Sequence, residues 1–447
     1  MAETAPSDDL YGVAYALCDA GQFRKAQPII ERYLAGNPES SRGWVVASWA
    51  ANSIGDSTAG LEYAARAISL APEKEWPVRT YAIALRGLGR VGLALEFARK
   101  ATDLEPNEVL AWRCVAESAR YFGLPEEAES AANRAMTIAP DNVHATYALA
   151  AAAAVMDRNE GIKIMLRTLE REPNSFSLLR ELAILYSYEG RLNEASDLLE
   201  RVLNQQPRDR NARHLYVTVR GVLGGVSTAK ELTREYLEDD LRSSTLEIEH
   251  RPTDFRAYVR SVGNARQLGR NSEALAFAKQ ANLHPPGEQF VGAWRALAYS
   301  ACAMRQWDLA QFAIEQACEL DPNAPSRWIE IAEVAFLAGD TDRSISWAQR
   351  VINEQPLCVY VFKAKAVIAH CLGDFENAST YLYEHLNRFP FASCSASQLA
   401  DCRAELGDHQ GAIDAWRITT IQDPLCACEW RQRAKTTMTR VGIRIEQ

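Results

Sequence analysis

Apolar, small and polar positions recur along the chain in a pattern that repeats about every 34 residues. A proline closes each repeat, and because proline cannot continue a helix, it marks the boundary between two helical units. Only one step between consecutive closing prolines departs from 34 residues by more than two. The pattern therefore predicts a stack of helical repeats that nearly fills the chain. The closing prolines are Pro38, Pro72, Pro106, Pro140, Pro173, Pro207, Pro252, Pro286, Pro322, Pro356, Pro390 and Pro424.

With each closing proline at position 32 of a 34-residue unit, position 15 is glycine in ten of twelve units. Glycine suits a tight turn between two antiparallel helices, because it adopts positive φ without steric cost. The exceptions are Asp157 in the fifth unit and Arg305 in the ninth. The ten glycines are Gly21, Gly55, Gly89, Gly123, Gly190, Gly224, Gly269, Gly339, Gly373 and Gly407.

Small residues fill two further columns, which predicts that two helices approach closely within each unit. Position 8 is alanine in most units, as in Ala14 and Ala82, and position 20 is small in almost all, as in Ala26 and Ala94. Tryptophans recur at position 4 and are predicted to lie in the core. They are Trp44, Trp112, Trp294 and Trp328.

These columns resemble the tetratricopeptide repeat family, whose signature is W-x2-L-G-x2-Y followed by A, F and P at fixed offsets. The resemblance extends over about residues 7 to 424. It implies an all-α fold in which antiparallel helix pairs stack into a right-handed superhelical solenoid with a concave groove. It also implies that the protein binds peptide segments or other protein surfaces. The periodicity itself predicts only stacked helical pairs.

The predicted domain organisation has one interruption. The seventh unit is about eleven residues too long, and its excess, residues 238–252, is acidic. Either its second helix is extended or a loop leaves the stack, so this segment is the candidate hinge. Because it is acidic, we also predict that it folds back onto the groove as an internal competitor. The expected division is a tail at 1–6, repeats 1–7 at 7–237, the acidic insertion at 238–252, repeats 8–12 at 253–424 and a C-terminal capping helix within 425–447.

Composition narrows the class of partner. The 447-residue chain has a formal net charge of −9 and a pI near 5.5, which argues against a general nucleic-acid binder. No stretch approaches the roughly 20 apolar residues that a membrane span needs. The start, MAETAPSDDL, lacks the features of a signal peptide. We therefore expect a cytoplasmic protein.

Ten cysteines are scattered along the chain without a CxxC pair, which predicts buried, reduced thiols and no metal or other cofactor. A redox or metal role stays open for the cysteines that gather near the C-terminus. These are Cys371, Cys394, Cys402, Cys426 and Cys428.

In the family that the chain resembles, positions 2, 5, 9 and 12 of the first helix line the groove. Across twelve units these 48 positions hold ten basic and four acidic residues. The chain average would give about five and six. The basic residues are Arg42, Arg79, Arg86, Arg113, Arg120, Arg180, Arg256, Arg266, Arg295 and Lys363, and the acidic ones are Asp8, Glu117, Glu333 and Asp401.

Four of these arginines define the predicted binding site. Arg79 and Arg86 are two helical turns apart on one face, and Arg113 and Arg120 repeat this spacing 34 residues later. Stacked helices would set the four at the corners of a rectangle about 10 Å on a side, where an acidic partner relieves their repulsion. The alternative is that they pair with neighbouring acids such as Glu117. Further predicted contacts around this quartet are Arg42, Trp49, Trp76, Tyr147 and Arg180.

The sequence predicts binding rather than catalysis. It contains no GxxxxGK[ST], GxSxG or HExxH motif, and its seven histidines show no metal-ligand spacing. The leading hypothesis is a non-catalytic scaffold or adaptor whose arginine- and aromatic-lined groove binds an acidic or phosphorylated segment of a protein partner. The alternative is a regulatory or sensory module whose superhelix changes shape when a ligand binds. An enzyme is the least favoured class, since no catalytic set of residues is visible.

Overall fold

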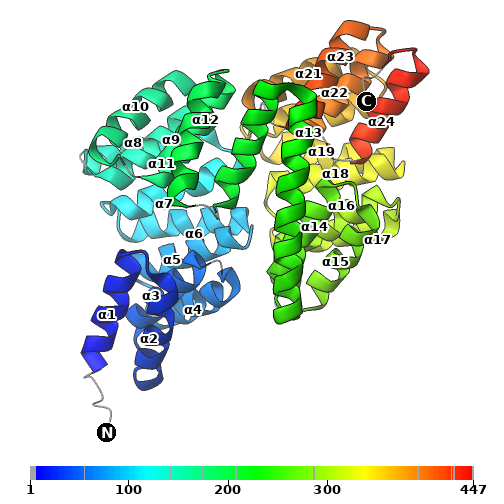
Figure 1. Ribbon diagram of the computed structural model, residues 1–447. Helices are drawn as coiled ribbons and strands as arrows, with labels where there is room; N and C mark the ends of the chain where they lie inside the picture. The colour runs from blue at the N-terminus through cyan, green and yellow to red at the C-terminus, as the bar shows by residue number, and fades with distance from the viewer. Residues whose placement is uncertain are drawn as a thin grey trace. The chain divides into compact units, whose positions relative to one another are not determined.

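The computed structural model describes residues 7–54, 56–140, 142–173, 175–206, 209–284, 287–389, 392–423, 425 and 428–444. Within these ranges the chain forms 24 α-helices and one short 3-10 helix, with no strand (Figure 1). The all-α prediction is therefore confirmed. The predicted tail at residues 1–6, together with Gly55 and Cys426, falls outside the described residues.

Helix boundaries follow the 34-residue period closely. The first helices of the repeats are α1 (Ser7–Asp19), α3 (Ser41–Ser53), α5 (Glu75–Gly87), α7 (Val109–Phe122), α9 (Val143–Met156), α11 (Phe176–Tyr188), α14 (Phe255–Gln267), α16 (Val291–Ala303), α18 (Pro325–Ala338), α20 (Val361–Cys371) and α22 (Ser393–Glu405). The second helices are α2 (Phe23–Gly36), α4 (Ser57–Leu70), α6 (Val91–Leu104), α8 (Pro125–Ile138), α10 (Arg158–Arg171), α12 (Leu192–Gln205), α15 (Asn271–Leu283), α17 (Trp307–Leu320), α19 (Thr341–Glu354), α21 (Phe375–Arg388) and α23 (His409–Gln422). The seventh repeat is α13 (Arg210–His250), the 3-10 helix is η1 (Gly287–Gln289), and α24 (Glu429–Arg440) follows the last repeat and packs on α22.

The glycine column forms the turns between paired helices, as predicted. Eight of its ten glycines adopt positive φ: Gly21, Gly89, Gly123, Gly190, Gly269, Gly339, Gly373 and Gly407. In the seventh repeat Gly225, and not Gly224, has the positive φ. In the ninth repeat Arg305 adopts the same left-handed conformation, with φ 55°. Asp157 instead caps α10, where its side chain accepts from the backbone N–H groups of Asn159 and Glu160.

The acidic segment of the seventh repeat is helical. α13 contains a kink at Gly225 (φ 81°, ψ 178°) and then runs without a break to His250. The structure thus has the extended second helix, one of the two alternatives that the sequence left open, and residues 251–252 begin the turn after it. Whether this helix also bends as a hinge stays a prediction.

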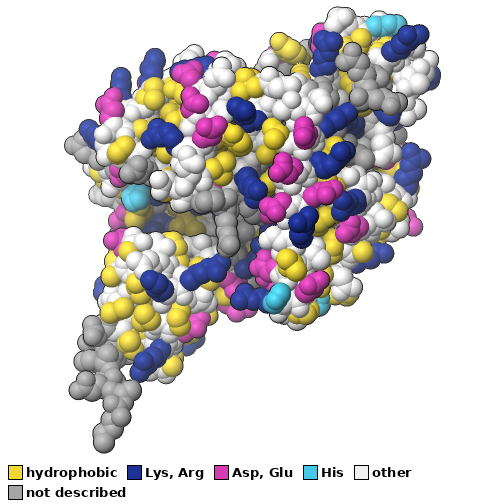
Figure 2. All heavy atoms as spheres, in the orientation of Figure 1, with side chains coloured by type: hydrophobic (Ala, Val, Ile, Leu, Met, Phe, Trp, Pro, Cys, Tyr) yellow, Lys and Arg dark blue, Asp and Glu magenta, His cyan; other side chains and the backbone are white. Residues whose placement is uncertain are grey.

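The acids of this segment have basic partners close by, so its surface is a mixture of charges (Figure 2). Glu238 pairs with Arg270 at 2.8 Å, and Asp239 lies 3.3 Å from Arg213. Glu247 forms an ion pair with Arg260. Because these carboxylates are already neutralised by neighbouring arginines, the structure gives no support to the prediction that the segment folds back as a competitor.

The chain divides into two compact units. Unit 1 comprises Met1–Ala152, Gln289–Val291 and Leu320–Ala324, and unit 2 comprises Ala153–Glu288, Gly292–Glu319 and Pro325–Gln447. The predicted hinge at 238–252 therefore lies inside unit 2. Each unit is described separately below.

Small residues form the core of both units. Alanines at positions 8 and 20, such as Ala82 and Ala128 in unit 1 and Ala366 and Ala412 in unit 2, are almost completely buried. Among the position-4 tryptophans only Trp328 is fully buried, while Trp44 and Trp112 are partly buried and pack against the core. The other three are half-buried, and each indole N–H donates to a carbonyl six residues earlier, which ties the inter-repeat turn to the next helix. Those bonds run from Trp44 to Pro38 at 2.7 Å, from Trp112 to Pro106 at 2.8 Å and from Trp294 to Glu288 at 2.8 Å.

Candidate functional site

The four arginines of the predicted quartet lie on α5 and α7, the first helices of repeats 3 and 4, in unit 1. All four side chains are partly buried. α7 is fixed at its start by Glu108, whose carboxylate accepts from the N–H of Leu110, and at its end by Gly123 with φ 99°. The two helices contact each other, so one repeat period brings equivalent positions side by side.

Glu117 is the centre of this cluster. Arg86 Nη2 donates to its Oε2 at 2.6 Å, and Arg113 Nε donates to its Oε1 at 2.7 Å. Burial raises the pKa of Glu117, but the charges of Arg86, Arg113 and Arg120 outweigh burial and hold the pKa below its ordinary value. One carboxylate is thus shared by two arginines, with a third nearby. The pairing with Glu117 that the sequence offered as the alternative is present, yet it neutralises only one charge.

Arg79 belongs to a separate ion pair within α5. Its Nε donates to Glu75, which is one helical turn earlier and only 2% exposed. Burial raises the pKa of Glu75, and the adjacent Arg79 charge opposes that rise. Arg79 is therefore held by its own helix, whereas the other three arginines gather around Glu117.

Two tyrosines accompany the arginines. The guanidinium carbon of Arg113 lies 5.4 Å from the ring centroid of Tyr147, which sequence analysis had placed at the site. Tyr121, which sequence analysis missed, is 52% exposed. Its ring centroid lies 5.2 Å from the guanidinium carbon of Arg120 and 5.9 Å from that of Arg86. Tyr121 is at position 13, just outside the columns assigned to the groove, so only the structure places it here.

The remaining predicted contacts are more dispersed. Arg42 is exposed on α3, one repeat before the quartet. Trp49, also on α3, makes edge contacts with Tyr15 and Phe23, each with ring centroids 6.0 Å apart.

Two further predicted residues complete the set. Trp76 is half-buried at the start of α5. Arg180 lies in unit 2, where it forms an ion pair with Asp209, the residue that caps α13. The structure thus gathers Arg86, Arg113, Arg120 and Tyr147 around one carboxylate, and it places Arg180 in the other unit.

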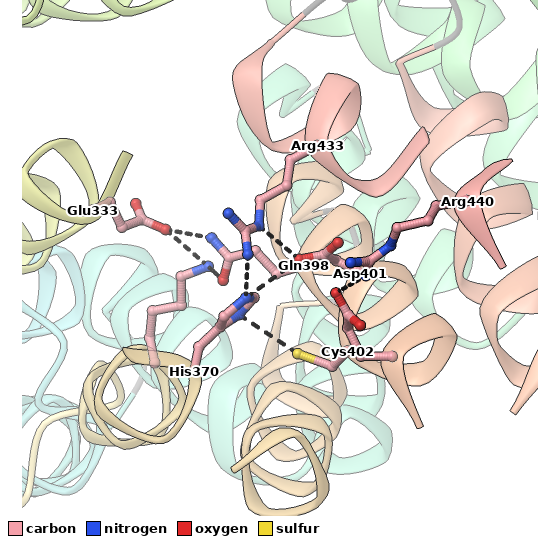
Figure 3. Close-up of polar contacts among 9 residues, drawn as sticks. Glu333, His370, Gln398, Asp401, Cys402, Arg433 and Arg440 are labelled. Carbon is pink, nitrogen blue, oxygen red and sulfur yellow. Dashed lines mark hydrogen bonds and ion pairs between the residues drawn. The ribbon is translucent and has the colours of Figure 1, made fainter. Parts of the chain in front are cut away.

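A second polar network occupies the inner positions of repeats 10 to 12 in unit 2 (Figure 3). Its first half centres on Lys363, which is 5% exposed. The ammonium group donates to Gln398 at 2.7 Å and to Ser395 at 2.9 Å, and it lies 3.1 Å from Glu333. Gln398 donates in turn to Glu333 at 2.7 Å.

The second half of this network attaches the last helix. Asp401, which is fully buried on α22, lies 3.2 Å from His370 Nε2 and accepts from Arg433 Nε of α24 at 2.8 Å. Burial raises the pKa of Asp401, but hydrogen bonds from His370 and Thr437 and the Arg433 charge reverse that effect and lower it. Trp430 stacks on Phe336 with centroids 5.2 Å apart. These contacts fix α24 against the preceding repeats.

Sequence reasoning contained the signal for this second network but did not combine it. Glu333, Lys363 and Asp401 had been counted in the inner columns, while His370 at position 12 was treated as an isolated histidine. Read across successive repeats, those columns alternate acid and base, which is the pattern of an ion-pair ladder between stacked helices.

Most cysteines are buried thiols. Burial raises the pKa of Cys302 and Cys402 to about 12 and of Cys18 and Cys358 to about 11. No disulfide joins the described cysteines, and no group of three or more His, Cys, Asp or Glu side chains in the described ranges is arranged to hold a metal ion. Likewise, no helix in the part of the chain that the structure covers combines the length and apolar character needed to cross a bilayer.

Comparison with known proteins identifies the repeat. The sequence pattern of the tetratricopeptide repeat family matches residues 11–75 and 295–357. None of the curated proteins matches the chain. Among solved structures, a thermophilic tetratricopeptide repeat protein of Thermus thermophilus is 20% identical and covers 40% of this chain and 98% of its own, with a TM-score of 0.37.

Two longer structures align over most of the chain. The Cut9–Hcn1 hetero-tetramer of APC/C gives 14% identity, 94% coverage of this chain, 88% of that chain and a TM-score of 0.37. Yeast Tom70 gives 14% identity, 97% and 95% coverage and a TM-score of 0.35.

Paired antiparallel helices on a 34-residue period, with a glycine turn inside most pairs, define a helical repeat protein. The family match covers one segment in each half of the chain, and the helix pairs between and around these segments keep the same period. The chain is therefore similar to tetratricopeptide repeat proteins in these two segments, and its fold is a stack of helical repeats.

Proposed function

We propose that the protein is a non-catalytic interaction scaffold or adaptor that binds an acidic or phosphorylated segment of a partner protein. The proposed binding surface is the cluster around Glu117 in unit 1, formed by Arg86, Arg113, Arg120 and the tyrosines beside them. The observation that carries this proposal is the sharing of one carboxylate among several arginines.

The charge of the cluster supports an anionic partner. Arg86 and Arg113 share the single negative charge of Glu117, which leaves this group with an excess of one positive charge, while Arg79 and Glu75 balance each other. Like charges this close repel each other, and a carboxylate or phosphoryl group bound between them relieves that repulsion. Arginine suits such groups because its planar guanidinium presents parallel donors to two oxygens.

The aromatic side chains support a peptide rather than a free ion. Tyr121 is more than half exposed and Tyr147 lies beside Arg113, so both rings border the charged cluster. Exposed tyrosines next to arginines are typical of the residues that dominate binding energy at protein interfaces. We expect them to contact side chains that flank the acidic residue of the partner.

Two further parts of the proposal rest on composition. The net charge of −9 supports a protein partner over nucleic acid. No disulfide joins the described cysteines, which supports action in the reducing cytosol.

The test uses neutral substitutions, because a glutamate at position 113 would face Glu117 and destabilise the helix pair. The variant is Arg113→Gln/Arg120→Gln, and the matched control is Arg99→Gln/Arg134→Gln, which removes two charges from the second helices of the same repeats. The probe is a fluorescein-labelled decapeptide of glutamate, with a phosphoserine-containing peptide and a glutamine decapeptide for comparison.

Fluorescence anisotropy should show binding of both anionic peptides to the full chain. The site variant should weaken it about tenfold or more, equivalent to about 1.4 kcal/mol, and the control about twofold at most. Equal losses in both variants would mean that only overall charge matters, and the proposal would be abandoned.

A further inference from the structure

Three charged residues form a compact group on the first helices of repeats 9 and 10 in unit 2. Arg295 Nη2 lies 2.6 Å from Glu330 Oε1, and Arg327 Nη1 lies 2.5 Å from Glu330 Oε2. Glu330 is buried, whereas the Arg295 side chain is 40% exposed. Glu330 thus pairs with both Arg295 and Arg327, so the three side chains together carry one net positive charge.

A third arginine lies close to this group. Arg266, at position 12 of α14, places its guanidinium carbon 5.2 Å from the ring centroid of Tyr299, and Arg295 lies 6.0 Å from the same centroid. Both arginines are therefore neighbours of one phenol ring. Among the residues that the structure describes, Arg266 has no carboxylate partner.

The missing partner distinguishes Arg266 from the other cations on this side of unit 2. Arg295 and Arg327 share Glu330, Lys363 lies beside Glu333, and Arg433 binds Asp401. Arg266 is half-buried, and its charge opposes the rise in the pKa of the buried Cys302 thiol, so the two groups lie near each other. Water therefore surrounds the guanidinium group of Arg266 only in part. An unpaired, partly desolvated charge is unfavourable, and a bound anion removes that penalty.

Tyr299 supplies a further donor. Burial raises its pKa well above the ordinary value, and the neighbouring Glu330 adds to that rise, so the phenol keeps its proton at neutral pH. A protonated phenol keeps its O–H as a donor, and the Tyr299 ring lies beside both Arg266 and Arg295. Arg266, Arg295 and Tyr299 thus bring several hydrogen-bond donors together around one phenol ring, and Arg295 is also bound to Glu330.

We propose that Arg266, Arg295 and Tyr299 form a second oxyanion-binding site, which takes a carboxylate or phosphoryl group of an acidic peptide segment. Charge complementarity selects this occupant. Arg295 and Arg327 share Glu330, the nearby Glu333 and Glu429 are paired with Lys363 and Arg305, and Arg266 adds a positive charge with no carboxylate of the described residues at ion-pair distance. The guanidinium groups of Arg266 and Arg295 bind the oxyanion, and the hydroxyl group of Tyr299 donates one further hydrogen bond to it. This site uses no residue of the Glu117 cluster, so it goes beyond the proposed function and stands without it.

The experiment measures binding to the full chain by isothermal titration calorimetry, with the glutamate decapeptide and a phosphoserine decapeptide as separate probes. Wild-type protein should bind two peptides. Arg266→Gln should bind one, while the control Arg270→Gln, four residues later on the exposed side of the same repeat, should still bind two. Tyr299→Phe keeps the ring but removes the hydroxyl group. It should raise the dissociation constant of the second site about threefold, which corresponds to about 0.7 kcal/mol. The tighter of the two probes identifies the oxyanion.

The outcomes separate this site from the Glu117 cluster. Loss of one equivalent in Arg266→Gln and of the other in Arg113→Gln/Arg120→Gln supports both proposals. Unchanged stoichiometry and affinity in Arg266→Gln would overturn the second site and leave the first intact. A melting temperature lowered by several degrees in Arg266→Gln would also overturn it, because the arginine would then serve the fold. A result in which only Arg266→Gln loses binding would support the second site against the first.

Discussion

The carboxylate of Asp321 accepts hydrogen bonds from the backbone N–H of Gly92, a residue 229 positions earlier in the chain. The two N···O distances are 3.0 and 3.2 Å, and a third bond of 3.3 Å comes from the N–H of Leu93. These N–H groups open α6, whose own N-cap residue, Arg90, provides no side-chain acceptor. Asp321 is fully buried and belongs to unit 1 with α6, so a distant residue caps this helix.

Replacing Asp321 with alanine should weaken the start of α6. The buried N–H groups of Gly92 and Leu93 would lose their acceptor, and losing such a cap costs about 1–2 kcal/mol. Hydrogen-exchange mass spectrometry should show faster exchange at the first turn of α6, by roughly 5- to 30-fold. Asp308→Ala, an exposed aspartate on α17, is the control and should leave α6 unchanged. Unaltered exchange in Asp321→Ala would contradict the capping role.

Replacing Gly92 with alanine tests the same contact from the other side. A Cβ built on Gly92 would lie 2.9 Å from Asp321 Oδ1, closer than real Cβ contacts allow. The substitution should therefore push the carboxylate away and produce the same local increase in exchange. Combining it with Asp321→Ala should add little further, because both changes break one interaction.

Arg305 stands where ten other repeats have glycine, and we expect Arg305→Gly to stabilise unit 2. Arg305 is the one non-glycine residue with positive φ among those the structure describes. The left-handed conformation costs an L-residue about 1–2 kcal/mol. Its ion pair with Glu429, at 3.2 Å, joins an exposed arginine to a largely buried carboxylate, so losing this pair offsets part of the gain. Urea denaturation should show a higher midpoint for Arg305→Gly.

A comparison with Arg305→Ala separates the two effects. Alanine also removes the ion pair with Glu429 but keeps the backbone strain. The glycine variant should therefore exceed the alanine variant by about 1 kcal/mol, whatever the ion pair contributes. Equal midpoints for the two variants would show that the turn carries no strain.

Much of this fold could be predicted from the sequence, because local rules decide it. Proline ends a helix, glycine allows the turn, and small residues permit close packing. The 34-residue repeat therefore predicted the position of nearly every helix. Asp157 and Arg305 were recognised as departures, and the structure resolves one as a helix cap and the other as a left-handed arginine. Such features depend on a few neighbouring residues, which the sequence displays directly.

The candidate sites could be predicted only in part, since they depend on contacts between repeats. The inner columns located Arg86, Arg113 and Arg120, but not how many of them Glu117 would pair with. Asp321 and Gly92 share no sequence signal, because their contact is tertiary. The same limit applies to residues 238–252: spacing showed the excess, while the helical continuation of α13 follows from packing and from ion pairs with Arg213, Arg260 and Arg270.

His385 should make unit 2 sensitive to acid. It occupies position 27, where other repeats have buried Ala67, Ala101 or Val351. Burial, with the nearby charges of Lys363 and Arg388, lowers the pKa of His385 from 6.5 to about 3. Between these pH values the unfolded chain binds a proton that the folded chain does not. Stability therefore falls as pH drops from about 6.5 toward 3, by about 1.4 kcal/mol per pH unit.

Urea denaturation between pH 7 and pH 4.5 measures this slope. His385→Val, which copies the residue of the preceding repeat, should flatten it by about one proton equivalent. His409 is exposed on α23, so His409→Val should give the same slope as the wild-type protein. A slope unaffected by His385→Val would mean that other groups cause the acid sensitivity.

Lys363 and Glu333 should be energetically coupled. Lys363 is buried and binds Gln398 and Ser395 as well as Glu333, so its charge is compensated only inside this network. Lys363→Met leaves the carboxylate of Glu333 without its cation, and breaking a buried pair in this way costs about 3 kcal/mol or more. Glu333→Gln likewise leaves an uncompensated ammonium group. The double variant removes both charges, so it should be less destabilised than the sum of the single variants.

A double-mutant cycle by urea denaturation at neutral pH gives the coupling directly. We expect about 1–3 kcal/mol, the range found for residues in one hydrogen-bonded network. Arg350→Met with Glu354→Gln provides the comparison, because that pair is exposed on α19 and should couple by no more than about 0.5 kcal/mol. If both cycles gave the same small value, the network in unit 2 would be a solvated surface. A large value for the buried cycle alone would show that Lys363 and Glu333 hold α18, α20 and α22 together.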